Sequence, residues 1–174
     1  RAMAWEEKAE VRIWTPTAEF GLPICLDPFR PPTGKMTKSE LISSWELMAV
    51  NFTILAGYDV EKMSSGILIK TFLYELLAES ARLDCLPTNF ADLSEMVGNP
   101  AMILDGDAET SSVDAIMKRI KGPVREELSR RLNALDSGVS QLLFTLGVPM
   151  DIDTLLEPAK NGKVPVNIFF LKSL

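Results

Sequence analysis

Hydrophobic and polar positions follow a helical period through the middle of the chain. Five apolar residues recur at spacings of four, three, four and three: Leu41, Trp45, Met48, Phe52 and Leu55. This spacing predicts one apolar stripe on a helix, with the aromatic residues in a protein core. Thr37 and Glu40 fit the capping box that begins such a helix, and Gly57 is the expected stop.

Two more helices are predicted after this one. Asp59 is the expected cap of the second, which runs to about Leu83. Its apolar face comprises Met63, Ile67, Phe72, Leu73, Leu76 and Leu77. The third begins after Pro87-Thr88-Asn89 and ends at Gly98. Its inward residues are expected to be Phe90, Leu93, Met96 and Val97.

The pattern weakens after Gly98 and then becomes helical again. A linker rich in Asp, Gly and Ser runs to about Ser112, and Gly122-Pro123 separates two predicted helices, 113–121 and 124–135. A short apolar turn follows at 141–146. Asp151 and Asp153 come just before an apolar run, so we expect them to cap a helix rather than to form a catalytic carboxylate pair.

Strands are predicted near the two ends. Residues 10–15 form a short strand, and residues 164–171 form a nearly continuous apolar, β-branched run. Such a run is typical of a strand buried on both faces of a parallel sheet, which also needs crossover helices. We therefore expect the chain to be part of a larger α/β protein. Five prolines between positions 16 and 32 exclude a helix there and leave little room for an interior strand.

Composition narrows the class of protein. The 174 residues carry a net charge of −6, which argues against a general binder of nucleic acid or anionic membranes. No apolar stretch approaches 18 residues, so no membrane span is predicted and we expect a cytoplasmic protein. Cys25 and Cys85 lie in apolar surroundings and are expected to be buried free thiols, with a disulfide as the alternative.

Several kinds of site are excluded by the residues themselves. The chain has no histidine, which removes His-based nucleophile systems and His-containing metal sites. Gly34-Lys35 lacks the earlier glycine and the following Ser or Thr of a phosphate-binding loop. The acidic cluster 105–109 lacks the Gly and Glu that an EF-hand loop needs at its sixth and twelfth positions, so a solvated loop is expected there. No catalytic, cofactor-binding or metal residue is assigned.

One segment is strongly basic. Between Met117 and Arg131 there are six basic residues and two acidic ones, so the net charge of this window is +4 and that of the remainder of the chain is −10. One interpretation is a solvated helix face with a Glu126–Arg130 pair. The other is that an arginine contacts a neighbouring subunit's nucleotide or a nucleic-acid phosphate. The candidates for such a contact are Arg125, Arg130 and Arg131.

The order of several segments resembles the region between the Walker A and Walker B motifs of HerA/FtsK-type DNA-translocating ATPases, especially HerA-like proteins. The matching segments are Val11-Arg12-Ile13-Trp14-Thr15-Pro16 with Gly21-Leu22-Pro23-Ile24, the run Arg125 to Leu135, the run Gly147 to Leu156, and Gly162-Lys163-Val164-Pro165-Val166-Asn167-Ile168-Phe169. Together they span nearly the whole chain. The Walker A loop, the Walker B carboxylate and the sensor elements are not among them, so the family's nucleotide-contacting residues cannot be transferred.

The resemblance implies a mainly α fold: a helical bundle with a small β element made by the N- and C-terminal strands, as a fragment of a larger RecA-like α/β ATPase domain. Residues 1–36 would be a strand and a proline-rich connection from the motor sheet. Residues 37–160 would be a helical insertion, and residues 161–174 a buried strand of the same sheet. The two terminal strands would be neighbours or near neighbours.

The resemblance also implies a function for the parent protein. It would be a hexameric ring of sister subunits that moves along double-stranded DNA, uses ATP and Mg²⁺, and often works with a nuclease. The present chain would not be catalytic on its own and would serve subunit or partner contacts. The alternatives are a self-standing helical protein-interaction module without ATPase activity, and a nucleic-acid binder that uses the 117–131 segment.

Overall fold

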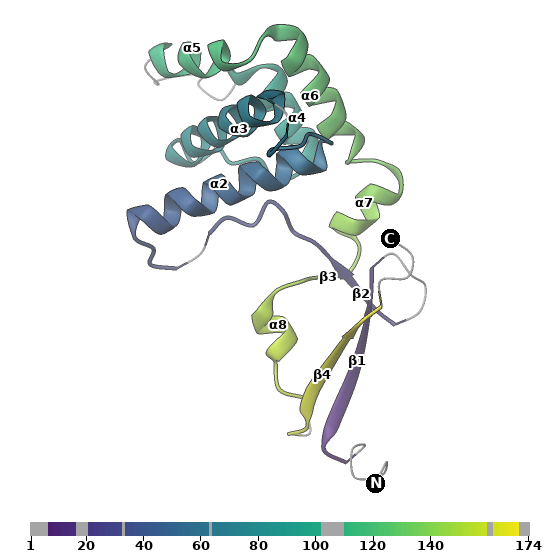
Figure 1. Ribbon diagram of the computed structural model, residues 1–174. Coiled ribbons are helices and arrows are strands. Elements are labelled where there is room, and N and C mark those ends of the chain that lie inside the picture. Colours follow the sequence, from purple (N-terminus) through teal and green to yellow (C-terminus); the bar gives the residue numbers. More distant parts are fainter. Residues whose placement is uncertain are drawn as a thin grey trace. The chain divides into compact units, whose positions relative to one another are not determined.

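The computed structural model describes residues 7–16, 21–32, 34–62, 64–101, 110–159 and 162–170 (Figure 1). Its elements in chain order are β1 (Ala9–Thr15), β2 (Leu22–Cys25), α2 (Lys38–Leu55), α3 (Ser64–Arg82), α4 (Phe90–Gly98), α5 (Thr110–Arg119), α6 (Gly122–Ala134), α7 (Gly138–Thr145), β3 (Val148–Pro149), α8 (Ile152–Leu156) and β4 (Val164–Phe169). The mainly helical class predicted from the sequence is therefore confirmed. None of the helices described is long and apolar enough to cross a membrane.

The chain divides into two compact units. The sheet unit comprises Arg1–Asp27 and Gly138–Leu174, and the helical unit comprises Pro28–Ser137. These limits differ from the predicted ones at 36/37 and 160/161. The Phe29 ring packs against Phe52 and Phe90 of the helical unit, so the chain enters that unit before the first helix. Leu26 N donates to Leu143 O at 2.8 Å, which joins α7 to the sheet unit.

The first helix of the helical unit begins as its sequence predicts. Thr37 and Glu40 form a complete capping box, because the Thr37 side chain accepts from Glu40 N while the Glu40 carboxylate accepts from Thr37 N. This satisfies amide groups that have no partner within the helix. Gly57 follows the helix with φ of 81°, a conformation that glycine adopts without steric cost.

The core of the helical unit confirms most of the predicted inward residues. Fully buried side chains from the second and third predicted helices include Phe72, Leu73, Leu76, Leu77, Phe90, Leu93 and Val97. On α2, Trp45 and Phe52 are buried as predicted, but Leu41 and Leu55 are exposed. The small buried side chains of Ala49 and Thr53 show that the inward face of α2 is rotated from the predicted stripe.

Aromatic contacts organise one part of this core. The ring of Phe29 lies 5.0 Å from that of Phe52 and 4.8 Å from that of Phe90, centroid to centroid. Phe52 and Phe90 are 6.0 Å apart and nearly perpendicular. Such edge-to-face geometries are favoured by the ring quadrupoles. The contacts bring α2, α4 and the segment before α2 together.

Helix boundaries within the unit agree with the predictions in most places. Gly122-Pro123 begins α6, with Pro at the first turn, where its missing N–H costs nothing. Asn89 caps α4, since its side chain accepts from Asp92 N at 2.8 Å. Asp59 is an exception: its carboxylate accepts from Glu61 N and Lys62 N, so it closes a turn ahead of α3.

The strands of the sheet unit form one parallel sheet in the order β3-β2-β1-β4. The two strands predicted at the ends of the chain are direct neighbours, paired from Ala9↔Val164 to Trp14↔Phe169. Their predicted adjacency is therefore confirmed. The prediction that the proline-rich segment leaves little room for an interior strand is wrong, because β2 lies between β1 and β3. Its pairing covers only two residues on each side, which is how it accommodates Pro23.

Two further differences from the predictions concern α7 and the two cysteines. The segment 141–146, predicted as a turn, forms most of α7, which begins after Ser137 with Gly138 at φ of 64°. Cys25 is buried and Cys85 is half-buried, and both are free thiols. Burial raises the pKa of both thiols, with Asp27 adding to the effect at Cys25.

Candidate functional site

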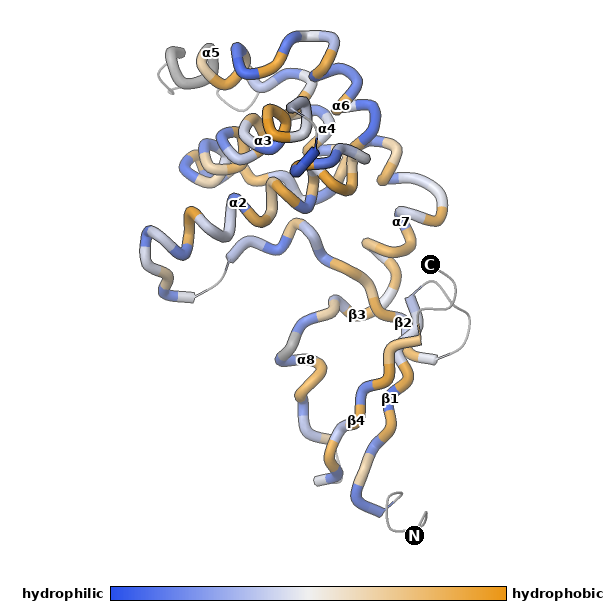
Figure 2. The backbone as a smooth tube through the Cα atoms, viewed as in Figure 1, coloured by the Kyte–Doolittle hydropathy of each residue, from blue (hydrophilic) through white to orange (hydrophobic). Residues whose placement is uncertain are grey.

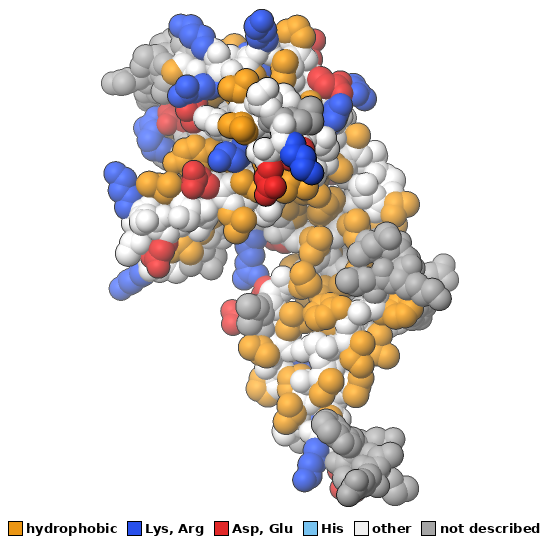
Figure 3. Space-filling view, in the orientation of Figure 1, with side chains coloured by type: hydrophobic (Ala, Val, Ile, Leu, Met, Phe, Trp, Pro, Cys, Tyr) orange, Lys and Arg blue, Asp and Glu red, His pale blue; other side chains and the backbone are white. Residues whose placement is uncertain are grey.

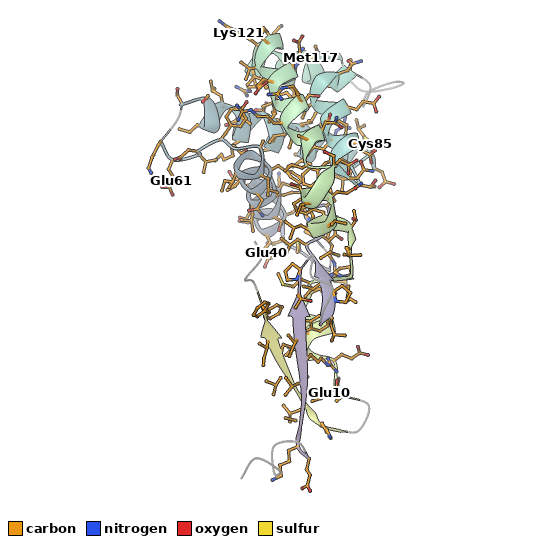
Figure 4. All side chains as sticks on the ribbon, turned by 90° about the vertical axis from the view of Figure 1, so that its right-hand side faces the viewer. Glu10, Glu40, Glu61, Cys85, Met117 and Lys121 are labelled. Atoms are coloured by element: carbon orange, nitrogen blue, oxygen red, sulfur yellow. The ribbon has the colours of Figure 1, made fainter. Side chains whose placement is uncertain are left out.

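Arg125 is the first of the three candidate arginines and lies in the second turn of α6. Its Nη1 donates to Met117 O at 3.2 Å, at the turn between α5 and α6 that Met117 and Lys121 mark in Figure 4. Its Nε is buried without a hydrogen-bond partner. Arg125 therefore closes a turn within the helical unit, and only part of its guanidinium has a hydrogen-bond partner there.

Arg130 extends from α6 into solvent, with a side chain 71% exposed. Its Nε and Nη2 bind the two carboxylate oxygens of Glu127 at 3.0 and 2.8 Å. The predicted pairing with Glu126 is wrong. Glu127 lies three residues before Arg130 and four before Arg131, so one carboxylate reaches both guanidinium groups.

Arg131 joins α6 to the end of α2. Its Nε donates to Glu127 Oε1 at 2.6 Å, its Nη1 donates to Ala56 O at 3.2 Å, and its guanidinium lies 4.7 Å from the centre of the Tyr58 ring. The arginine thus meets a carbonyl at the C-terminus of a helix, where a cation is stabilising. Hydrogen bonds from Arg131 and then Arg130 lower the pKa of Glu127.

These contacts change how the basic segment is interpreted. Each candidate arginine has an intramolecular partner, and Arg119 binds Glu75 through two hydrogen bonds of 2.7 and 2.9 Å. A guanidinium has five N–H donors, and the contacts of Arg130 with Glu127 use two of its three nitrogen atoms. The geometry therefore fits a structural role for Arg131 most closely, and the contact of this segment with a nucleotide or nucleic acid stays a prediction.

Where the structure describes them, the remaining sequence motifs form no chemical site. Near Gly34-Lys35, the Glu40 carboxylate accepts from both the amide and the hydroxyl of Thr37, at 2.7 and 2.8 Å, so an acidic group occupies the N-terminus of α2. The acidic cluster 105–109 lies outside the described residues. Among the residues that the structure describes, His, Cys, Asp and Glu side chains form no group of three or more that could hold a metal ion.

The β1–β4 ladder presents the most distinctive surface of the chain. Because paired residues of parallel strands point to the same side, the register defines two faces. One face, which we call the polar face, carries the charged, amide and aromatic residues of the ladder together with one proline: Glu10, Arg12, Trp14, Pro165, Asn167 and Phe169. The other face, which we call the aliphatic face, carries Ala9, Val11, Ile13, Val164, Val166 and Ile168.

The polar face is tied to α8 by a hydrogen-bond chain. Trp14 Nε1 donates to Asn167 Oδ1 at 2.7 Å, and Asn167 Nδ2 donates to Leu155 O at 2.8 Å. Trp14 is buried, so its N–H needs a partner within the protein. One amide side chain therefore connects β1, β4 and the short helix α8.

The aliphatic face is open. Val11, Ile13, Val164 and Ile168 are 58%, 45%, 65% and 46% exposed, and hydrophobic side chains gather over this unit in Figure 3. Hydrophobic positions likewise recur along β1 and β4 in Figure 2. In this chain the last strand is therefore exposed on its aliphatic face, and its burial on both faces within a larger sheet stays a prediction. Contiguous exposed aliphatic side chains are typical of an interaction surface.

The sequence held signals for both faces. Glu10, Val11, Arg12 and Ile13 alternate polar and apolar residues, which indicates two unlike faces. Asn167 interrupts an otherwise apolar run, and a buried amide needs hydrogen-bond partners. The partners themselves, Trp14 and Leu155, become evident only from the fold.

Comparisons with protein families, with curated proteins and with solved structures found no match for this chain. A function is therefore inferred from the residues and the geometry described above.

Proposed function

We propose that this chain is the helical insertion region of an ATP-driven double-stranded DNA translocase of the HerA type. In this proposal the sheet unit belongs to the sheet of the parent motor domain. The helical unit serves contacts with sister subunits of a hexameric ring or with a partner such as a nuclease. The chain itself is not catalytic, and ATP and Mg²⁺ bind elsewhere in the parent protein.

One observation carries the proposal: the two outer segments of the chain pair in parallel and leave an aliphatic face open. Val164–Phe169 pairs with Ala9–Thr15 over six residue pairs, and the chain leaves the sheet after β2 and returns to it at β3. Purely parallel sheets occur almost only with both faces covered. A four-stranded parallel sheet with an exposed aliphatic face is therefore expected to be covered by further elements of a motor domain.

The resemblance in segment order supports the HerA type for that motor. The segments that resemble the HerA/FtsK type include β1, β2, the α6 region and β4, and the paired strands among them are adjacent as the resemblance implies. The insertion between them has a closed core of its own. This arrangement supports a role in contacts outside the catalytic centre.

The coding sequence on either side of the chain gives the first test. The proposal expects a GxxxxGK[ST] loop upstream and an acidic strand downstream. A reading frame that lacks both would end the proposal.

A biochemical test follows where those motifs are present. In the parent protein, Val11→Asp would place a charge on the aliphatic face and should abolish ring assembly and DNA-stimulated ATP hydrolysis. Val139→Asp, at an exposed position on α7, is the matched control and should leave both intact. Equal activity of the two variants would contradict a covered aliphatic face.

A second candidate function is a self-standing helical interaction module. The observation that favours it is the compactness of the helical unit, Pro28–Ser137, whose core is formed by its own helices. Residues 28–137 produced alone should then unfold cooperatively and remain monomeric. A parent reading frame without ATPase motifs, together with this behaviour, would favour the module over the motor.

A further inference from the structure

An apolar pocket opens within the sheet unit, away from the aliphatic face. It has a volume of about 280 Å³ and is lined by Pro16, Ile24, Cys25, Leu26, Leu143, Met150 and Phe169. These residues come from four strands or the residues that follow them, and from α7. Ile24 and Cys25 are buried, whereas Leu26, Met150 and Phe169 are more than one-third exposed, so the pocket has a floor and a mouth.

The position of the pocket is informative. Pro16 follows β1, Cys25 and Phe169 end β2 and β4, and Met150 follows β3. All these strands are parallel, so their carboxyl ends, marked by arrowheads in Figure 1, lie at one edge of the sheet. Ligands of open parallel sheets bind outside the carboxyl ends of the strands.

The chemistry of the lining restricts the ligand. The only side chain in the lining that can donate a hydrogen bond is Cys25, whose Sγ already lies 3.6 Å from Gly147 O, and the Met150 sulfur is at most a weak acceptor. Burial raises the pKa of this thiol, so it contributes to the lining as a neutral, apolar group. A charged or strongly polar ligand would lose its hydration without gaining a partner.

The volume restricts the size. An apolar cavity of about 150 Å³ accommodates benzene, and this pocket is nearly twice as large. We propose that the pocket is a binding site for one compact, uncharged aromatic group of about the size of two fused rings. This inference does not depend on the proposed function, because it rests only on the sheet unit.

The proposal can be tested with 1-methylindole, which has two fused rings and no hydrogen-bond donor. The chain should bind it saturably, with a methyl-NMR shift at Met150 among the eight methionines. Benzimidazole has the same size but carries a donor and an acceptor, and it should bind at least about tenfold more weakly, because those groups would be left unsatisfied.

A pair of variants locates the site. Met150→Trp fills the mouth of the pocket and should weaken binding of 1-methylindole at least about tenfold in ligand-observed NMR titrations. Val139→Trp adds the same side chain to α7, outside the lining, and should leave the affinity unchanged. Circular dichroism of both variants should match the unsubstituted chain, since both positions are exposed.

A further comparison distinguishes the source of the aromatic group. Stronger binding of 1-methylindole than of N-acetylphenylalanine amide would assign the site to a free small molecule, and the reverse would assign it to a side chain of a polypeptide partner. Non-saturating shifts spread over several methionines, or equal binding by the two Trp variants, would overturn the proposal.

Discussion

The helical unit and the sheet unit differ in how far they bury their apolar side chains. In the helical unit, large side chains such as Phe52, Phe72 and Leu132 are fully buried. In the sheet unit, Val11 and Val164 lie on the open aliphatic face. Both units have apolar residues, but the sheet unit buries only a few of them, such as Trp14, Ile24 and Cys25, and leaves its aliphatic face open. An apolar composition therefore does not indicate whether a region forms its own core or an interaction surface.

The largest expected effect is the loss of an aromatic ring from the helical unit. Phe52→Ala should lower the free energy of unfolding by about 3–5 kcal/mol, because it removes the contacts with Phe29 and Phe90 and leaves a cavity. Leu47→Ala, on the exposed side of the same helix, should change it by no more than about 0.5 kcal/mol. Urea unfolding followed by circular dichroism measures both. Equal effects would mean that α2 does not bury the face described here.

A glycine tests the close packing of the same unit. A Cβ at Gly66 would collide with the backbone carbonyl of Asp59, whereas one at Gly122 would meet nothing within 4 Å. Gly66→Ala should destabilise the unit by about 1–3 kcal/mol, because the backbone must shift. Gly122→Ala is the matched control and should be nearly neutral. A thermal melt of the two variants compares them, and identical melting temperatures would contradict the close approach.

The sheet unit has its own polar determinant of stability. Asn167→Ala should destabilise that unit by about 1–3 kcal/mol, because the buried Trp14 N–H loses its acceptor. Asn167→Asp keeps an oxygen that can accept from Trp14 but loses the N–H that donates to Leu155 O. Its change in the free energy of unfolding should therefore differ from that of Asn167→Ala. Hydrogen exchange resolved by segment should show faster exchange in β1 and β4 and no change in α3. Faster exchange in both units would show that they do not unfold separately.

A pH-dependent effect is expected at the junction of α6 and α2. The pKa of Glu127 is lowered in the folded state by Arg131 and Arg130, so its stabilising contribution is present above the unfolded-state pKa of about 4.3. That contribution is lost as the pH falls through the lowered folded-state pKa. Glu127→Gln should therefore reduce the unfolding midpoint at pH 7 and converge with the unsubstituted chain in acid.

Salt gives the control for this ion pair. The pairs are partly exposed, so about 1 M salt should shrink the difference between Glu127→Gln and the unsubstituted chain at pH 7. A difference that does not depend on either pH or salt would contradict the ionic origin of the effect.

The smallest effect is expected on the aliphatic face. Val11→Thr and Ile168→Thr should each change the free energy of unfolding of this chain by no more than about 0.5 kcal/mol, because both side chains are already largely exposed. The same changes should weaken assembly of the parent protein if the aliphatic face is covered there. Large destabilisation of the chain alone would show that this face belongs to its own core.

The sequence predicted local features well where the signal lies within one turn. The capping box of Thr37 and Glu40, the stop at Gly57 and the break at Gly122-Pro123 all depend on neighbouring residues, and all are present. Features that depend on distant residues were harder to predict from the sequence. The short interior strand β2 contradicts the prediction from its prolines, because two pairs on each side are enough to hold it between β1 and β3.

The candidate arginines show the same limit. The basic window is evident from composition. Two partners of Arg131, however, are Ala56 O and the Tyr58 ring, which lie more than 70 residues earlier in the chain. No local pattern links these positions. The pairing of Arg130 with Glu127 rather than Glu126 depends on side-chain geometry that spacing alone leaves open.

The sequence by itself determined some helix ends, such as the start of α2 at its capping box and the break before α6, because these signals are set by residues within a few positions of each other. It also indicated that β1 and β4 are strands. The tertiary structure alone decided that they pair in parallel, which of their faces α8 covers, and which face is left open. Burial depends on the neighbours that the fold brings to a residue, and those neighbours come from distant parts of the chain.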